Sequence, residues 1–164
     1  MSCGSEQKKI EQKNRIELEF LNYYRNEISK DKEILLLDTP SDYNLQECLL
    51  KVTIEKEYAL FDKDDFVDKF NSALWNEKEI VDVKLISKAD LPNIMIFKSW
   101  SNFRKNVGKG YHIFSHPIVS KDLKYILFFA AYYCGDKCGY DSLALYEKTE
   151  TGWKLVKKYC DGVS

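Results

Sequence analysis

Cys134 and Cys138, in the segment Cys-Gly-Asp-Lys-Cys, form the pattern in this sequence that most resembles a reactive site. A thioredoxin-like redox motif has two intervening residues and lies at a helix N-terminus, which lowers the pKa of its thiol. Here three residues intervene, and both neighbouring segments have the composition of strands. A zinc site would need a second ligand pair, which neither Cys48 nor Cys160 supplies. We therefore predict a structural disulfide between Cys134 and Cys138.

Two histidines, His112 and His116, are the other candidates for metal binding or acid–base chemistry. On a helix, a spacing of four residues would place both rings on one face. This segment has the composition of a strand, in which the rings would share a face but lie roughly 13 Å apart, too far for one metal ion. We predict structural or solvent-facing histidines, with no metal and no cofactor.

The acidic residues within 62–68 raise the question of calcium binding. Counted from Asp62, the glycine and the glutamate of an EF-hand loop would fall on Val67 and Ala73, so the motif fails. Acidic residues here are instead typical of a helix N-terminus. The segment Gly108-Lys109-Gly110 lacks the spacing of a phosphate-binding loop.

The start of the sequence, Ser2-Cys3-Gly4-Ser5 and a polar continuation, is similar to the start of a mature bacterial lipoprotein. In that class the signal peptide is cut just before the cysteine, and the cysteine is lipidated. The apolar leader does not precede Cys3 here, and we expect that Met1 stands in its place. The alternative is an ordinary N-terminus that carries a cysteine. We predict a tether over residues 1–13, lipidation at Cys3 and a single domain over residues 14–164.

The number of cysteines gives separate support for an oxidising compartment. If Cys3 carries a lipid, four of the five cysteines remain, and four can pair as two disulfides. Beside a Cys134–Cys138 bond, Cys48 and Cys160 would be the remaining pair, although the sequence does not place them close together. The alternative is a cytoplasmic protein with five free thiols, each acting as a small apolar side chain.

The composition is that of one folded domain. Of 164 residues, 45% are hydrophobic and 14% are aromatic, enough to bury a core without a metal. The 25 basic and 26 acidic residues leave no excess of positive charge for nucleic-acid binding. No apolar segment approaches the roughly 18 residues of a membrane span. We expect no nucleic-acid partner, and membrane contact only through an N-terminal lipid; the oligomeric state is unknown.

Apolar periodicity predicts the elements of the first two thirds. Apolar residues at three- and four-residue steps predict helices over residues 8–29, 62–74 and 99–107. Short apolar runs predict strands over residues 33–37 and 80–86. Residues 43–60 are ambiguous: residues 45–50 are compatible with a helix, but β-branched residues favour a strand over 50–58, which we predict. The buried faces of the second and third helices would be formed by Phe66, Phe70, Ala73, Leu74, Trp100 and Phe103.

In the last third of the sequence, residues of high β-propensity predict four strands, over residues 112–119, 124–133, 142–148 and 153–159. Their connections are so short that they can join only antiparallel neighbours. The fold class is therefore α+β: an antiparallel β-sheet that ends in a four-strand meander, with two or three helices packed on one face.

The same part of the chain resembles the C-terminal meander of small, uncharacterised envelope lipoproteins of the Bacteroidetes type. The residues that carry this resemblance are Phe114-Ser115-His116-Pro117-Ile118, Ser120-Lys121-Asp122, Tyr132-Tyr133-Cys134-Gly135-Asp136-Lys137-Cys138-Gly139-Tyr140, Leu145-Tyr146-Glu147-Lys148 and Gly152-Trp153-Lys154-Leu155-Val156. It covers about a third of the chain and implies a fold and a compartment, but no activity.

Tyrosines crowd this meander, notably Tyr132, Tyr133, Tyr140 and Tyr146. Alternation along strands would place about half of them on the solvent side. Exposed tyrosine is enriched at recognition surfaces because it gives a large contact area at a small entropic cost. Two interpretations stay open: a recognition surface, or a concave core under the helices.

These observations favour a non-enzymatic lipoprotein of the bacterial cell envelope, in the periplasm or on the surface, that binds another protein. An inhibitor or immunity factor is one form of such a protein. The first alternative is a small-ligand-binding module with an apolar pocket between sheet and helices. The second is a hydrolytic enzyme in which His112 or His116 meets a cysteine, serine or carboxylate.

Overall fold

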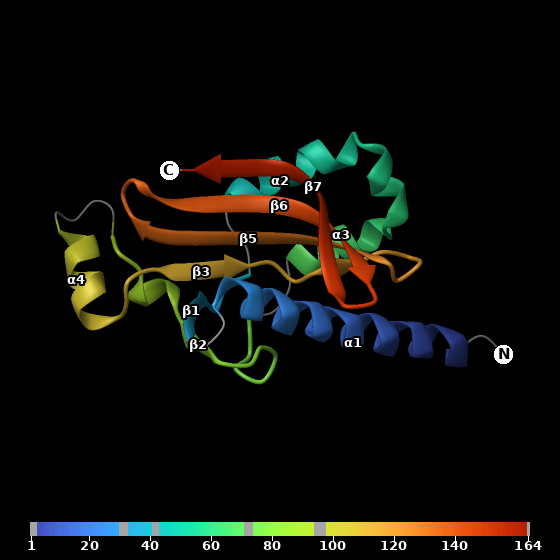
Figure 1. The fold of residues 1–164 in the computed structure, drawn as a ribbon, viewed down its shortest axis with the longest axis horizontal. Coiled ribbons are helices and arrows are strands. Elements are labelled where there is room, and N and C mark those ends of the chain that lie inside the picture. Colours follow the sequence, from blue (N-terminus) through green and yellow to red (C-terminus); the bar gives the residue numbers. More distant parts are fainter. Residues whose placement is uncertain (1–2, 30–32, 41–42, 71–73, 94–97, 164) are drawn as a thin grey trace.

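The computed structural model describes residues 3–29, 33–40, 43–70, 74–93 and 98–163, which form one mixed β-sheet with helices on both faces (Figure 1). In these residues the sheet has seven strands, in the order β2-β1-β3-β5-β6-β7, with β4 paired to β5 beside that path. The strands are β1 (Ile34–Leu37), β2 (Val83–Ile86), β3 (Tyr111–Phe114), β4 (Ile118–Val119), β5 (Tyr125–Gly135), β6 (Cys138–Thr149) and β7 (Gly152–Val163). The helices are α1 (Cys3–Ile28), α2 (Tyr43–Thr53), α3 (Lys63–Phe70) and α4 (Ser99–Asn106), with the 3₁₀ helices η1 (Lys56–Leu60) and η2 (Lys88–Asp90). The predicted α+β class is confirmed.

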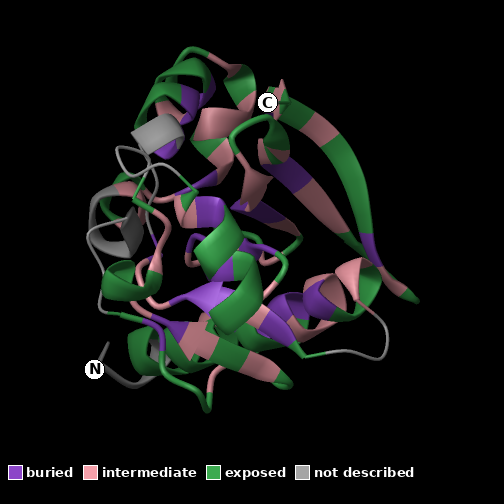
Figure 2. Ribbon diagram, turned by 90° about the vertical axis from the view of Figure 1, so that its left-hand side faces the viewer, coloured by how far each residue is buried: buried purple, intermediate pink, exposed green. Residues whose placement is uncertain are grey.

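The centre of the sheet is β5, whose residues 126–131 are all buried. Side chains alternate across a strand, so β5 contributes to two hydrophobic clusters on opposite faces of the sheet. The first cluster includes Ile126, Phe128 and Ala130, and the second includes Leu127, Phe129 and Ala131. Both faces therefore need a helix layer, and Figure 2 shows buried residues on the strands and on the helix sides turned toward them.

α1 covers the first cluster. Ile16, Phe20 and Tyr24 recur at four-residue steps and form its apolar stripe. The ring of Phe20 lies 5.0 Å from that of Phe128 and 5.3 Å from that of Trp153 on β7. The sequence predicts two or three helices on one face of the sheet. The structure has α2, α3 and α4 on one face and, in addition, α1 on the opposite face.

The first half of α1 extends past the sheet. Residues 6–12 are exposed, and the start of α1 projects beyond the strands at one end of the molecule (Figure 1). Lys13 pairs with Asp62 at 2.9 Å and with Asp65 at 2.7 Å. The segment 1–13, predicted as a tether, is therefore helical from Cys3 onward and continuous with the part that packs on the sheet.

The second cluster is covered by α2, α3 and α4. Leu45, Cys48 and Val52 form the buried stripe of α2. The predicted strand over residues 50–58 is wrong, because this stripe, at steps of three and four residues, outweighs the β-propensity of single β-branched residues. Trp100 and Phe103 of α4 are buried as predicted.

Other predictions are confirmed in part. The meander from β5 to β7 is antiparallel, but β1 and β2 pair in parallel, so the sheet is mixed. The predicted strand over 112–119 is divided into β3 and β4 around Pro117, which has no N–H to donate to a neighbour. α3 ends at Phe70, and Leu74 is 61% exposed; the side chain of Phe70, and Ala73, lie outside the described residues.

Two disulfides are present in the described residues, one between a helix layer and the sheet and one within a hairpin of the sheet. Cys48 of α2 is bonded to Cys160 of β7, across a sequence separation of 112 residues and a Cα–Cα distance of 5.6 Å. Cys134 is bonded to Cys138 at the end of the β5–β6 hairpin, with a Cα–Cα distance of 5.1 Å. Both pairs named from the sequence are thus confirmed.

We expect the two disulfides to differ in their effect on stability. In the chain-entropy account, the stabilisation grows with the closed loop, from about 2 kcal/mol for a separation of 4 residues to about 5 kcal/mol for 112. Replacing Cys48 and Cys160 together by alanine should therefore lower the free energy of unfolding at least twice as much as replacing Cys134 and Cys138. Urea unfolding followed by circular dichroism measures both, and equal losses would contradict this account.

Candidate recognition site

The four tyrosines named from the sequence lie in three places. Tyr146 lies under α1, with its ring 5.1 Å from that of Phe20, and burial raises its pKa to about 12. Tyr133 points to the opposite face, where its ring lies 5.7 Å from that of Tyr111 beside the second cluster. These two tyrosines are half-buried parts of the core.

Tyr132 and Tyr140 come together. They are direct partners on β5 and β6, and their ring centroids lie 5.9 Å apart. On the other side of Tyr132, His112 of β3 is its direct partner, at a ring distance of 4.7 Å. We call His112, Tyr132 and Tyr140 the aromatic row. It crosses three neighbouring strands on the sheet face that α1 covers elsewhere.

The aromatic row lies beyond the part of the sheet that α1 covers. The last aromatic residue of α1, Tyr24, packs against Phe114 at 5.6 Å, and Phe114 is two residues along β3 from His112. Tyr140 is 39% exposed, and its partner on β7, Val163, is 88% exposed. The row therefore reaches the surface near the β5–β6 hairpin.

Gly110 leaves room for Tyr132. A Cβ at Gly110 would lie 2.6 Å from the hydroxyl oxygen of Tyr132 and 2.5 Å from the carbonyl oxygen of Tyr133. These distances are shorter than non-bonded atoms tolerate, so a side chain here would displace Tyr132. No sequence motif singles out Gly110. Its role becomes visible only in the structure, where it lies directly before β3 and diagonal to Tyr132 on the neighbouring strand.

The side chains of the aromatic row are suited to making contacts with another molecule. Burial lowers the pKa of His112 to about 4, so its ring is neutral near neutral pH and a weak general base there. The row presents two phenols and one neutral imidazole, which carry no charge. Such groups bury apolar area while their hydroxyl and ring nitrogen atoms remain able to form hydrogen bonds.

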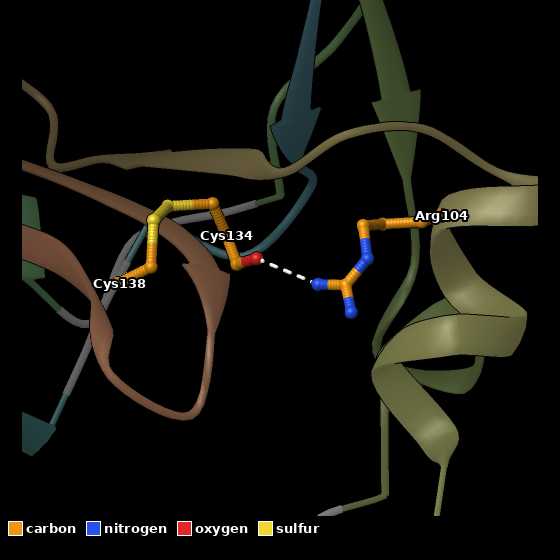
Figure 3. Close-up of a disulfide and its surroundings, with 3 residues drawn as sticks. All are labelled: Arg104, Cys134 and Cys138. Atoms are coloured by element: carbon orange, nitrogen blue, oxygen red, sulfur yellow. Dashed lines mark hydrogen bonds between the residues drawn. A yellow bond between two sulfur atoms is a disulfide. The ribbon is translucent and has the colours of Figure 1, made fainter.

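The Cys134–Cys138 disulfide holds the end of the hairpin that carries Tyr132 and Tyr140 (Figure 3). Arg104 of α4 donates a hydrogen bond to the carbonyl oxygen of Cys134 at 3.1 Å. The disulfide and this hydrogen bond hold the hairpin end next to α4. They limit the movement of the two strands that position the tyrosines.

The two histidines contact different rings. His116 stacks on Trp75, with ring centroids 3.8 Å apart, whereas His112 contacts Phe114 and Tyr132. Among the residues that the structure describes, no three His, Cys, Asp or Glu side chains are grouped to hold a metal ion. No helix among them is both long enough and apolar enough to cross a membrane.

Comparison of the chain with known protein families, with curated proteins and with solved structures found no match. We therefore infer a function from the geometry and the sequence of the molecule itself.

Replacing His112 by phenylalanine should reduce the loss of stability in mild acid. The pKa of His112 is about 4 in the folded protein and about 6.5 in an unfolded chain. Between these values the unfolded chain binds more protons, so stability is full above about pH 6.5 and decreases toward pH 4, by up to about 3 kcal/mol.

Urea unfolding at about pH 7 and about pH 5 measures this difference. The wild-type protein should lose more stability between the two conditions than the His112→Phe variant, in which the other titrating groups are unchanged. The same loss in both proteins would mean that His112 is not held in a desolvated position.

Proposed function

We propose that this chain is a non-enzymatic lipoprotein of a bacterial cell envelope that binds another protein through the aromatic row. The observation that carries the proposal is that Tyr132 and Tyr140 meet His112 beyond the end of the α1 layer, with Tyr140 39% exposed. Tyrosine is enriched at protein interfaces because it gives a large contact area with few rotatable bonds. Binding as an inhibitor or immunity factor falls within this proposal.

Two features support an envelope location. The first is the pair of disulfides, since disulfides persist in oxidising compartments such as the periplasm and the cell surface. The second is the sequence Ser2-Cys3-Gly4, which supports lipid attachment at Cys3. A cytoplasmic location is the alternative.

A lipid on Cys3 would leave the aromatic row facing away from the bilayer. Cys3 begins α1 at one end of the molecule, and the β5–β6 hairpin lies at the other end (Figure 1). The exposed helical segment 6–12 adds a spacer of roughly 10 Å, at about 1.5 Å per residue. This arrangement favours a partner outside the membrane.

A small-ligand-binding module is the second candidate function. A depression of about 540 Å³ over η1 favours it, since small-molecule sites have volumes of about 300 to 1,000 Å³. The depression lies at the surface, whereas the sequence-based alternative places an apolar pocket between the sheet and the helices.

Photocrosslinking tests the proposed protein-binding function. Tyr140 is replaced by p-benzoylphenylalanine in cells of the native host, and Leu50 of α2, which is 69% exposed, is replaced in the same way as a control. We expect a discrete partner to crosslink at position 140 and not at position 50. The purified partner should bind Tyr140→Ala at least about tenfold more weakly than wild type, a loss of about 1.4 kcal/mol.

Leu50→Ala should bind that partner as the wild-type protein does. Equal affinities of the wild type and Tyr140→Ala would remove the aromatic row as the binding site. Turnover of a substrate that depends on one histidine or cysteine would overturn the non-enzymatic assignment.

A further inference from the structure

The depression over η1 is lined by residues of η1, the start of α3 and the turn between β4 and β5. Its apolar lining includes Phe61, which is 1% exposed, and Tyr58, which is half-buried. Three exposed lysines from three different segments also line it: Lys56 of η1, Lys63 of α3 and Lys121 of the turn. An apolar floor and three cations therefore border one volume of about 540 Å³.

Lys121 is held over η1. Its Nζ donates a hydrogen bond to the carbonyl oxygen of Ala59 at 3.0 Å. Its backbone N–H donates to the carbonyl oxygen of Leu60 at 2.8 Å. These two bonds order the third lysine before a ligand arrives, which lowers the entropic cost of binding.

Two carboxylates also line the depression, but each of them already binds a lysine from another element. Asp62 accepts a hydrogen bond from Lys13 of α1 at 2.9 Å, and this bond holds the pKa of Asp62 below its usual value. Glu55 accepts a hydrogen bond from Lys157 of β7 at 2.7 Å. The neighbouring Glu57 lies 3.5 Å from the same lysine. The acids of this region are thus paired with lysines that do not line the depression.

The lysines that line the depression have no such direct pairing, although the charges of Lys121 and Lys56 contribute to lowering the pKa of Asp62 and of Glu57. Within the described parts of the chain, Lys56 and Lys63 form no salt bridge, and the side chain of Lys121 bonds to a carbonyl oxygen. One exposed ion pair contributes little to binding. Three ammonium groups around one multiply charged group contribute together, and lysine binds phosphate as a point charge.

We propose that this depression binds a phosphate-bearing ligand with an apolar body, at a site separate from the aromatic row. Such a group occurs on free phosphate monoesters and on phosphatidic acid, a phospholipid whose headgroup is itself a phosphate monoester. Lys13, which pairs with Asp62, lies in the half of α1 that begins at Cys3. The depression therefore lies toward the end of the molecule that a lipid on Cys3 would bring to the bilayer.

Titration of the full chain with phenyl phosphate, followed by amide chemical shifts, tests the site. We expect shifts at residues 55–63 and around Lys121. The variant Lys56→Gln/Lys63→Gln, which keeps the bond from Lys121 to Ala59, should bind at least about tenfold more weakly. Lys105→Gln, an exposed lysine of α4, is the matched control and should bind as the wild type does. Phenol, which has the same body without the charge, should cause no such shifts.

Co-sedimentation with vesicles of phosphatidic acid and phosphatidylcholine distinguishes the two sources of phosphate. Vesicle binding that phenyl phosphate displaces assigns the site to a lipid headgroup, and binding of phenyl phosphate alone assigns it to a free monoester. The proposal is overturned if neither probe binds, if the double variant binds phenyl phosphate as tightly as the wild type, or if Lys105→Gln weakens binding equally.

Discussion

The burial of β5 on both faces is the constraint on which the rest of the structure depends. Residues 126–131 point alternately to two hydrophobic clusters, and a side chain such as Phe128 or Phe129 contributes about 2 to 3 kcal/mol only where it is covered. One helix layer cannot cover both faces, so α1 lies on one and α2, with α3 and α4, lies on the other. The Cys48–Cys160 disulfide then fastens the second layer to the edge strand β7.

The lengths of these layers explain why one end of the sheet is open. β5 and β6 have 11 and 12 residues and extend about 36 Å at roughly 3.3 Å per residue. The part of α1 that packs on the sheet, residues 16–28, spans roughly 20 Å at about 1.5 Å per residue. α1 therefore does not reach over the hairpin end of this face, where the aromatic row lies and Tyr140 is exposed. Because α1 begins at the other end, the aromatic row and Cys3 lie far apart (Figure 1).

The parts of the fold that are predictable from the sequence are those that short segments determine. The strands from β5 to β7 and helix α4 have their turns, stripes and alternation within a few neighbouring residues. The parallel pairing of β1 with β2 joins Ile34 to Val83 and depends on the helices between them, so no local pattern reveals it. The site is predictable in part: Tyr132, Tyr140 and Tyr146 share one face by alternation. The place where α1 ends, a tertiary feature, decides that Tyr146 lies under the helix and that Tyr140 is exposed.

We propose an anchored envelope domain whose remaining cysteines are paired. The mass of the mature protein from its native host, alkylated with and without prior reduction, tests this most directly. We predict an acylated N-terminal cysteine that corresponds to Cys3, and four further cysteines that react only after reduction. An unacylated N-terminus with five cysteines that react without reduction would contradict both the anchoring and the disulfides.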